Sequence, residues 1–231
     1  DLERVEFVNK KEGWAVGGII RMAPTNEAMR HDKRGGYAYI FHTDDGGKTW
    51  QMQYGMRGRH LFGVDFIDSQ TGYACGERGI LLKTEDGGAH WQTLSSFGTT
   101  QWLYDIEFRN SMTGFMVGGF GTVLKTTDGG KTWNELDVQP DRKFYGFYRH
   151  FREITFNGST GCIVGQNGSM LISHNGGDDW SPSATTVAAD TREYMDLCRV
   201  HFPTSTDGYA VGRLGTRIMV TRDGGNSWTL Q

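Results

Sequence analysis

The chain repeats one short turn sequence five times, and this repeat constrains the fold more than any other feature. Each copy has a Thr or Ser, then an Asp or Asn two residues later, a Gly two residues after that and a Trp three residues further on. The five tryptophans, which are separated by 41, 42, 47 and 48 residues, are Trp50, Trp91, Trp133, Trp180 and Trp228. A repeat of this length indicates that one supersecondary unit is stacked against copies of itself.

Two further motifs precede every turn sequence. The first is an aliphatic residue, a polar residue and a Phe, as at residues 64–66. This alternation predicts a strand with its apolar side chains inward and its polar side chains outward. The second is a glycine-bounded strand with an aromatic residue and a Val, as in Gly114–Gly118. With a strand on each side of the turn sequence, every repeat has four strands, which we name A to D in chain order.

Four antiparallel strands that recur in this way predict an all-β fold, a β-propeller. An isolated four-stranded blade exposes two apolar faces, and only neighbouring blades can cover both of them. The composition agrees, because 34 Gly against 4 Pro fits short strands joined by tight turns. We expect a single propeller domain over residues 1–231. Its predicted blades are approximately 1–55, 56–97, 98–139, 140–186 and 187–231.

The turn sequence predicts structural chemistry. Its Asp can accept hydrogen bonds from backbone amides in the hairpin between strands C and D, and its glycines supply the positive φ angles of the turn. Asn175 replaces the Asp in the fourth repeat, and an amide oxygen can accept the same bonds. We expect each Trp to be buried beside its turn, so that its truncation to Ala costs roughly 3 to 5 kcal/mol.

Taken together, the aliphatic-x-Phe strand, the Gly-aromatic-x-Val-Gly strand and the Asp-Gly-Gly-x-x-Trp box resemble the bacterial neuraminidase repeat, or Asp-box. The whole chain is most similar to the photosystem II assembly and stability factor family, although sialidases, some xyloglucanases and sortilin-type receptors have similar boxes. The resemblance implies a seven-bladed, lumenal or periplasmic protein that binds a partner polypeptide without catalysis. Five blades are visible here, so we expect either a five-bladed ring or part of a longer chain.

The connections from strand D to the next strand A, and those from B to C, are predicted to share one face of the blades. This face is basic and aromatic, whereas the rest of a chain with a net charge of −3 is acidic. Arginine and aromatic side chains are enriched at protein-binding hot spots, and the resemblance implies an arginine-rich docking patch. The predicted partner-binding residues are Arg57, Arg59, Arg78, Trp102, Phe120, Arg142, Lys143, Tyr145, Tyr148, Arg149, Arg152, Arg192 and Arg213.

Two segments of this face, 19–36 and 138–152, are longer than their counterparts in the other repeats. Insertions on one face of a repeat protein are usually where binding specificity resides. We therefore predict a non-catalytic scaffold or assembly factor that docks a partner protein, such as a membrane-complex subunit. The expected compartment is the periplasm, a lumen or the extracellular space.

Two other functions stay open. A sialidase-like glycoside hydrolase would need an arginine cluster, a Tyr nucleophile with its Glu, and an acid–base Asp, but the sequence has no early Arg-Ile-Pro segment. A carbohydrate-binding lectin could stack sugar rings on Trp102, Phe120 and Tyr145.

Other classes of function are not expected. The negative net charge disfavours nucleic acid, and no apolar run reaches the roughly 20 residues that span a bilayer. The seven histidines are scattered, so we predict no metal site, no cofactor and no catalytic residue. Cys75, Cys162 and Cys198 fit small core positions and are expected to form no disulfide.

Overall fold

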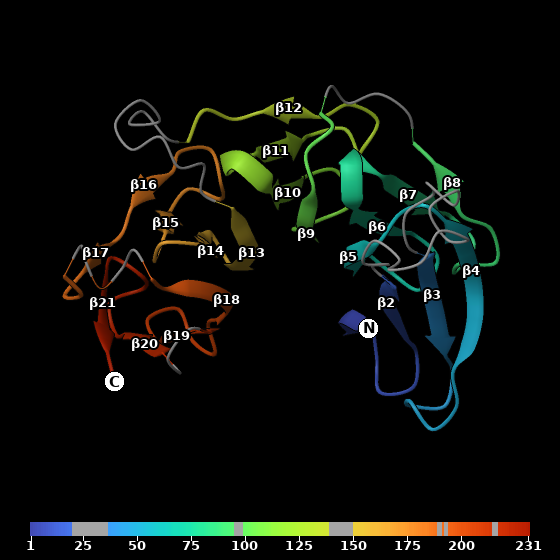
Figure 1. Ribbon diagram of the computed structural model, residues 1–231, viewed down its shortest axis with the longest axis horizontal. Helices are drawn as coiled ribbons and strands as arrows, with labels where there is room; N and C mark the ends of the chain where they lie inside the picture. Colours follow the sequence, from blue (N-terminus) through green and yellow to red (C-terminus); the bar gives the residue numbers. More distant parts are fainter. Residues whose placement is uncertain (20–36, 95–98, 139–149, 189–190, 192–193, 214–216) are drawn as a thin grey trace, which may run out of the picture. The chain divides into compact units, whose positions relative to one another are not determined.

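The computed structural model describes residues 1–19, 37–94, 99–138, 150–188, 191, 194–213 and 217–231. Strands dominate this part of the chain, and the short 3-10 turns η2 (Glu77–Gly79) and η3 (Gly119–Gly121) each connect two strands (Figure 1). No helix among these residues has the length and apolar character needed to cross a membrane. The all-β prediction is confirmed.

The chain forms two compact units, which are described separately: unit 1 is Asp1–Ser111 and unit 2 is Met112–Gln231. The division falls inside the third predicted blade, 98–139, whose strand A belongs to unit 1 and whose strands B to D belong to unit 2. The arrangement of all five repeats as one domain stays a prediction.

Unit 1 contains two complete antiparallel sheets, blades 1 and 2, and the first strand of the third repeat. The strands of blade 1, in the order in which they pair, are β1 (Leu2–Phe7), β2 (Gly13–Ile19), β3 (Tyr37–Thr43) and β4 (Gln51–Arg57). Those of blade 2 are β5 (Leu61–Phe66), β6 (Gly72–Gly76), β7 (Leu81–Thr84) and β8 (Gln92–Thr93). Strand β9 (Leu103–Phe108) packs beside β5.

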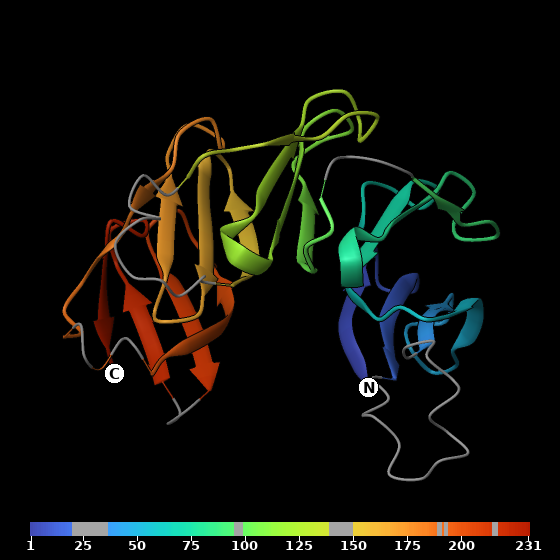
Figure 2. The same cartoon turned by 45° about the horizontal axis from the view of Figure 1, so that its top comes forward.

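Unit 2 contains the other three strands of the third repeat and two complete sheets, blades 4 and 5 (Figure 2). The first three strands are β10 (Gly114–Gly118), β11 (Val123–Thr126) and β12 (Asn134–Glu135). Blade 4 consists of β13 (Phe151–Asn157), β14 (Thr160–Gly165), β15 (Met170–Ser173) and β16 (Ser181–Pro182). Blade 5 consists of β18 (Asp196–His201), β19 (Gly208–Arg213), β20 (Arg217–Thr221) and β21 (Ser227–Leu230), and β17 (Ala184–Thr185) pairs in parallel with β21.

The Asp-boxes form the turns between strands C and D, as predicted. In the third box the Thr126 hydroxyl donates to Asp128 at 2.8 Å and accepts the Gly130 amide at 2.9 Å. Asp128 also accepts the hydroxyl and the amide of Thr132, at 2.6 and 2.9 Å. These bonds from Thr132 lower the pKa of Asp128 to about 2. The φ angles of Gly129 and Gly130, 69° and 78°, explain why glycines are needed there.

Asn175 makes the same turn in the fourth box. Its amide oxygen accepts the Ser173 hydroxyl at 2.9 Å and the Asp179 amide at 3.0 Å. The prediction that an amide oxygen can replace the carboxylate is confirmed.

The predicted burial of the box tryptophans is only partly correct. Trp133 and Trp228 are buried and donate their indole N–H groups to Gly130 and Gly225 at 3.2 Å. Trp91 and Trp180 are half-buried. Trp50 is exposed, because it lies on a face of blade 1 that no described segment of unit 1 covers.

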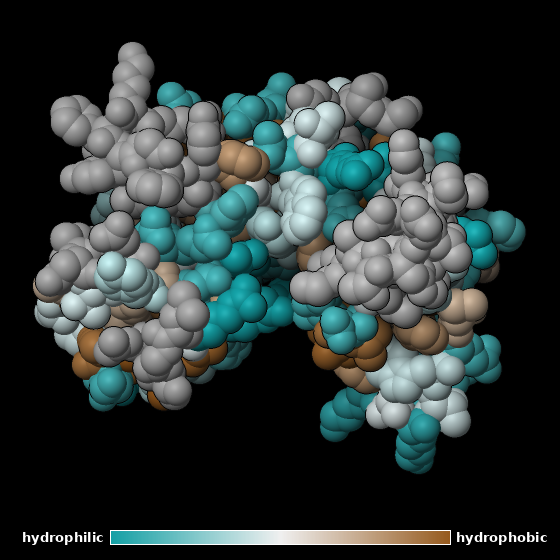
Figure 3. All heavy atoms as spheres, viewed as in Figure 1, coloured by the Kyte–Doolittle hydropathy of each residue, from teal (hydrophilic) through white to brown (hydrophobic). Residues whose placement is uncertain are grey.

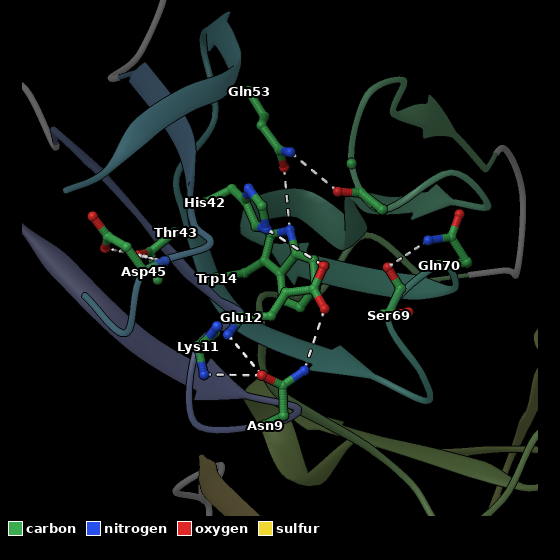
Figure 4. A network of polar contacts seen from close by, with 12 residues as sticks. Asn9, Lys11, Glu12, Trp14, His42, Thr43, Asp45, Gln53, Ser69 and Gln70 are labelled. Carbon is green, nitrogen blue, oxygen red and sulfur yellow. Dashed lines mark hydrogen bonds and ion pairs between the residues drawn. The ribbon is translucent and has the colours of Figure 1, made fainter. Parts of the chain in front are cut away.

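Contacts between blades hold each unit together. Between blades 1 and 2, Gln53 on β4 accepts the indole N–H of Trp14 at 3.2 Å and donates its amide to the carbonyl of Gly87 at 3.1 Å (Figure 4). Trp14 is fully buried and stacks on Phe66 with 3.6 Å between ring centroids. The Asp-box turn of one blade is thereby fixed against the strands of the preceding blade.

Candidate partner-binding surface

In unit 1 the structure brings two of the predicted arginines together. Arg59 follows β4, and its Nη1 donates to the carbonyls of Glu77 and Arg78 in η2 at 3.2 and 3.0 Å. Arg78 is exposed and has a φ angle of 55°, a conformation that is uncommon for a residue with a side chain. Arg59 therefore fixes the turn from which Arg78 extends into solvent.

Arg57 lies at the end of the hairpin formed by β3 and β4. It is exposed, and its guanidinium lies 5.5 Å from the centroid of the Tyr37 ring, which is opposite it in the strand pair. A cation that rests on an aromatic face keeps its N–H groups available. Arg57 can therefore bind a carboxylate while its side chain is held in place.

An aromatic row adjoins these arginines. Phe62 stacks on Trp102 and on His60, with 5.7 and 4.8 Å between ring centroids, and it packs against Tyr104 with 5.2 Å between ring centroids. Trp102 is partly exposed. We call Arg57, Arg59, Arg78 and Trp102 the unit 1 rim.

In unit 2 Phe120 occupies the position in η3 that Arg78 has in η2, with a φ angle of 57°. Its ring is partly exposed and contacts His150 edge-on at 5.4 Å. Partial burial, together with the charge of Arg152, lowers the pKa of His150. Phe120 therefore presents an apolar side chain where unit 1 presents a cation.

Arg152 and Arg213 both bind Asp196, which is buried. Arg152 reaches the two carboxylate oxygens with Nε and Nη2 at 3.1 and 3.3 Å, and Arg213 Nε binds one of them at 3.0 Å. The position of Arg152 on β13 directs its side chain to this carboxylate, so that it is mostly buried and already paired; its predicted role in partner binding stays a prediction. Arg213 is paired but mostly exposed.

The remaining predicted residues lie outside the described part of the chain, as do residues 20–36 of the first insertion. The predicted residues in question, which stay predictions, are Arg142, Lys143, Tyr145, Tyr148, Arg149 and Arg192.

Sequence reasoning missed a set of carboxylates on the A strands, which it placed outward. Glu6 accepts the Phe66 amide of the next blade at 3.2 Å, and Asp65 accepts the Phe108 amide at 2.5 Å. Glu153 accepts the amide of Val200 in the same way. Within the two units these carboxylates therefore join β1 to β5, β5 to β9 and β13 to β18, a long-range pairing that alternation within one strand does not reveal.

The carboxyl groups of Glu6 and Asp65 are hydrogen-bonded to each other. Burial, followed by the charge of Asp65, raises the pKa of Glu6 to about 10. Burial raises the pKa of Asp65 to about 6. At neutral pH the pair thus holds one proton, and Glu6 donates it. A signal was present in the sequence, since the middle residue of the strand A motif is acidic in the first three repeats.

Within the described residues, no three His, Cys, Asp or Glu side chains converge in a way that could hold a metal ion. The carboxylates of the A strands bind backbone amides and arginines instead. Their arrangement serves to join the blades.

Comparison with known proteins agrees with this geometry. A family model described as photosynthesis system II assembly factor YCF48 matches residues 88–188, and a BNR/Asp-box repeat model matches residues 41–52. The chain contains Asp-box repeats and is similar to YCF48. The predicted resemblance is confirmed. A search of curated proteins finds no match.

Three similar solved structures show the fold. YCF48 bound to D1 peptide is 18% identical with a TM-score of 0.58, over 100% of this chain and 82% of that one. YCF48 from Cyanidioschyzon merolae is 22% identical with a TM-score of 0.56, over 75% and 56% of the two chains. The GH74 enzyme of Niastella koreensis is 16% identical with a TM-score of 0.72, over 99% of this chain and 38% of that one. The predicted class, a propeller of four-stranded antiparallel blades, is confirmed.

Proposed function

We propose that this protein binds a partner polypeptide through the unit 1 rim and catalyses no reaction. The observation that carries the proposal is the exposure of two arginines, Arg57 and Arg78, and of the ring of Trp102 in unit 1. The YCF48 protein to which this chain is similar has been solved with a bound D1 peptide, which supports a polypeptide as the ligand class.

The rim is organised before the partner arrives. Arg57 rests on Tyr37, Arg59 fixes the η2 turn below Arg78, and Phe62 supports Trp102. Side chains that are already held lose less conformational entropy on binding. Guanidinium groups pair with carboxylates through two parallel hydrogen bonds, while Trp102 offers an apolar contact. The preferred partner is therefore an acidic polypeptide segment that also has an apolar side chain.

The likeness to a GH74 enzyme raises glycoside hydrolysis as the alternative. That chemistry commonly requires two carboxyl groups facing an open cleft, one of them as a general acid. The described carboxyl groups with the most raised pKa values, Glu6 and Asp65, bind each other and backbone amides. This arrangement favours a binding role. We place the protein, as its resemblance implies, in a lumen, the periplasm or the extracellular space, with a membrane-complex subunit as partner.

A charge-reversal experiment tests the proposal, with a fluorescent D1 peptide as the probe. The variant R57E/R78E should weaken binding at least about tenfold, which is about 1.4 kcal/mol. Its folding should change little, since exposed substitutions usually shift stability by no more than about 0.5 kcal/mol. Fluorescence anisotropy gives the affinity, and thermal unfolding checks the fold.

The matched control is K10E/K11E, which reverses two exposed lysines of unit 1 that lie between β1 and β2. It should leave the affinity unchanged. The proposal fails if the control weakens binding as much as R57E/R78E does. It also fails if the protein binds arrayed glycans and no peptide, a result that would favour the lectin.

A further inference from the structure

The connections that follow β6, β10 and β14, which join strand B to strand C, form the same turn. In each of them the amide of the fourth residue donates to the carbonyl of the first, and the two residues between have positive φ angles. The three hydrogen bonds run from Ile80 to Glu77 (3.2 Å), from Thr122 to Gly119 (3.1 Å) and from Ser169 to Gln166 (3.1 Å). Two successive positive φ angles are typical of a type I′ turn, in which Asn followed by Gly is favoured.

The turn after β14 follows this preference, whereas the turn after β10 does not. The first central residue is Asn167 in one, with a φ angle of 56°, and Phe120 in the other, with a φ angle of 57°. A positive φ angle is a genuine outlier for a bulky residue, so the turn by itself favours Asn or Gly in place of Phe120. Strained positions of this kind cluster at binding and active sites. The strain at Phe120 therefore indicates a side chain that serves more than the turn.

The ring of Phe120 is held on one side and accessible on another. It contacts His150 edge-on, with 5.4 Å between ring centroids, and it is 43% exposed. Its chain neighbours, Gly119 and Gly121, have no side chains that could cover it. Figure 3 shows apolar surface over η3, and hydrophilic surface over β13 and β18 of the same unit. Phe120 can therefore receive an apolar side chain from another molecule.

An exposed cation belongs to the same part of unit 2. Burial, together with the charge of Arg152, lowers the pKa of His150, and the charge of Asp196 opposes this shift, so His150 lies close to that ion pair. Arg213 binds the same Asp196 carboxylate through Nε at 3.0 Å, and its side chain is 65% exposed. Two arginines and one carboxylate give this cluster a net charge of +1. A carboxylate from another molecule would therefore be attracted to Arg213.

We propose that Phe120 and Arg213, which we call the unit 2 site, bind a polypeptide segment that has an apolar side chain and a carboxylate. Phe120 takes the apolar side chain and Arg213 the carboxylate. The inference rests on the proposed function only in taking a polypeptide as the ligand, since the unit 2 site shares no residue with the unit 1 rim.

A sugar fits the unit 2 site less well than a polypeptide. Sugar hydroxyls need hydrogen-bond acceptors, whereas the carboxylate of this cluster, Asp196, is buried and already bound by Arg152 and Arg213. The residue equivalent to Phe120 in unit 1 is Arg78, which has the same positive φ angle and belongs to the unit 1 rim. The same turn position therefore serves binding in both units.

Fluorescence anisotropy of the whole chain with a fluorescent D1 peptide tests the proposal. F120G should weaken binding at least about tenfold. Its melting temperature should stay within about 3 °C of that of the unaltered protein, because glycine accepts the positive φ angle and so offsets the loss of the ring contact. F120L, which keeps an apolar side chain, should bind more tightly than F120G. A Phe120 that served only the fold would give the opposite result, with a lower melting temperature and unchanged affinity.

The matched control is N167G, which makes the same change at the equivalent position of the turn after β14. It should leave the affinity unchanged, because Asn167 already fits that turn. R213Q should weaken binding at least about fivefold, while Arg152 still binds Asp196. An N167G variant that weakens binding as much as F120G does would overturn the proposal.

The unit 2 site and the unit 1 rim fail separately in this assay. If R57E/R78E weakens binding while F120G and R213Q do not, the rim stands and the unit 2 site is overturned. If F120G and R213Q weaken binding while R57E/R78E does not, the unit 2 site stands and the rim is overturned. An unaltered protein that binds no peptide overturns both, and its binding to arrayed glycans would favour the lectin.

A measurement on the unaltered protein needs no substitution. On addition of the D1 peptide, the NMR signals of the amides of Gly119 and Gly121, which flank Phe120, should shift. Amide shifts confined to unit 1 would overturn the unit 2 site and leave the unit 1 rim in place.

Discussion

Replacing Glu6 with Gln tests the hydrogen-bonded carboxyl pair of Glu6 and Asp65 between blades 1 and 2. The pKa of Glu6 is raised to about 10, from 4.5 for the ordinary group. Between these values the folded protein keeps a proton that the unfolded chain releases. Gln has a donor and an acceptor, as the protonated carboxyl group does, and should keep the bonds to Phe66 and Asp65.

The sign of the effect follows from this difference in proton binding. A group whose pKa is raised on folding stabilises the protein fully below its unfolded pKa, and this contribution is lost as the pH rises to the folded pKa. Because one proton is held only by the folded state, the free energy of unfolding falls by about 1.4 kcal/mol for each unit by which the pH rises. Asp65, with a pKa of about 6, is largely ionised in both states above pH 7. Between pH 7 and 9 the variant should therefore gain about 3 kcal/mol relative to the unaltered protein.

Urea unfolding at pH 7, 8 and 9, followed by tryptophan fluorescence, measures this gain. Taking the difference in unfolding free energy between variant and parent at each pH removes the contribution of the groups that titrate in both proteins. The control is E135Q, a change of an exposed residue on β12, which should leave the pH dependence as it is. If E6Q and the parent lose stability equally between pH 7 and 9, then Glu6 is ionised in the folded protein and the shared proton does not exist.

Three more predictions concern the blades. Trp14→Ala should lower the free energy of unfolding by about 3 to 5 kcal/mol, since Trp14 is fully buried, and Trp50→Ala should cost less than half as much in the same urea titration. Asp128→Asn should unfold at a higher temperature than Asp128→Ala, and the stability of the unaltered protein relative to both variants should fall as the pH falls toward the pKa of Asp128, about 2; equal melting temperatures of the two variants at pH 7 would contradict the turn chemistry. A thiol reagent should find three free thiols in the unfolded chain but at most one fast thiol in the native protein. All three cysteines are free: Cys198 is half-buried, whereas Cys75 and Cys162 are each buried. Burial raises the pKa values of the Cys75 and Cys162 thiols.

Local features of the fold could be predicted from the sequence. The box supplies its own hydrogen-bond partners within seven residues, from Thr126 to Thr132, so the turn and its flanking strands follow from the local sequence. That Asn175 can replace the Asp of the box was also predictable, because an amide oxygen accepts the same hydrogen bonds as a carboxylate oxygen. Alternation and glycine placement then define four strands for each repeat.

The candidate site could be predicted only in part. Sequence position placed Arg59 and Arg78 on neighbouring connections, and the structure joins them through a hydrogen bond. The same reasoning treated Arg152 as an equivalent exposed cation, although Asp196 neutralises it from another blade, 44 residues away. A charge on a loop or strand end is free or paired according to which side chain the next blade brings to it.

The sequence by itself thus determined the repeat, the strands, the box turns and the all-β class, because each depends on contacts within a few residues. Only the tertiary structure decided the burial of Asp65, the pairing of Arg152 and the exposure of Trp50. Each of these depends on the face of a neighbouring blade, and the same local motif is covered in one repeat and open in another. Whether a side chain is buried depends on both of the surfaces that pack together, whereas a sequence motif describes only one of them.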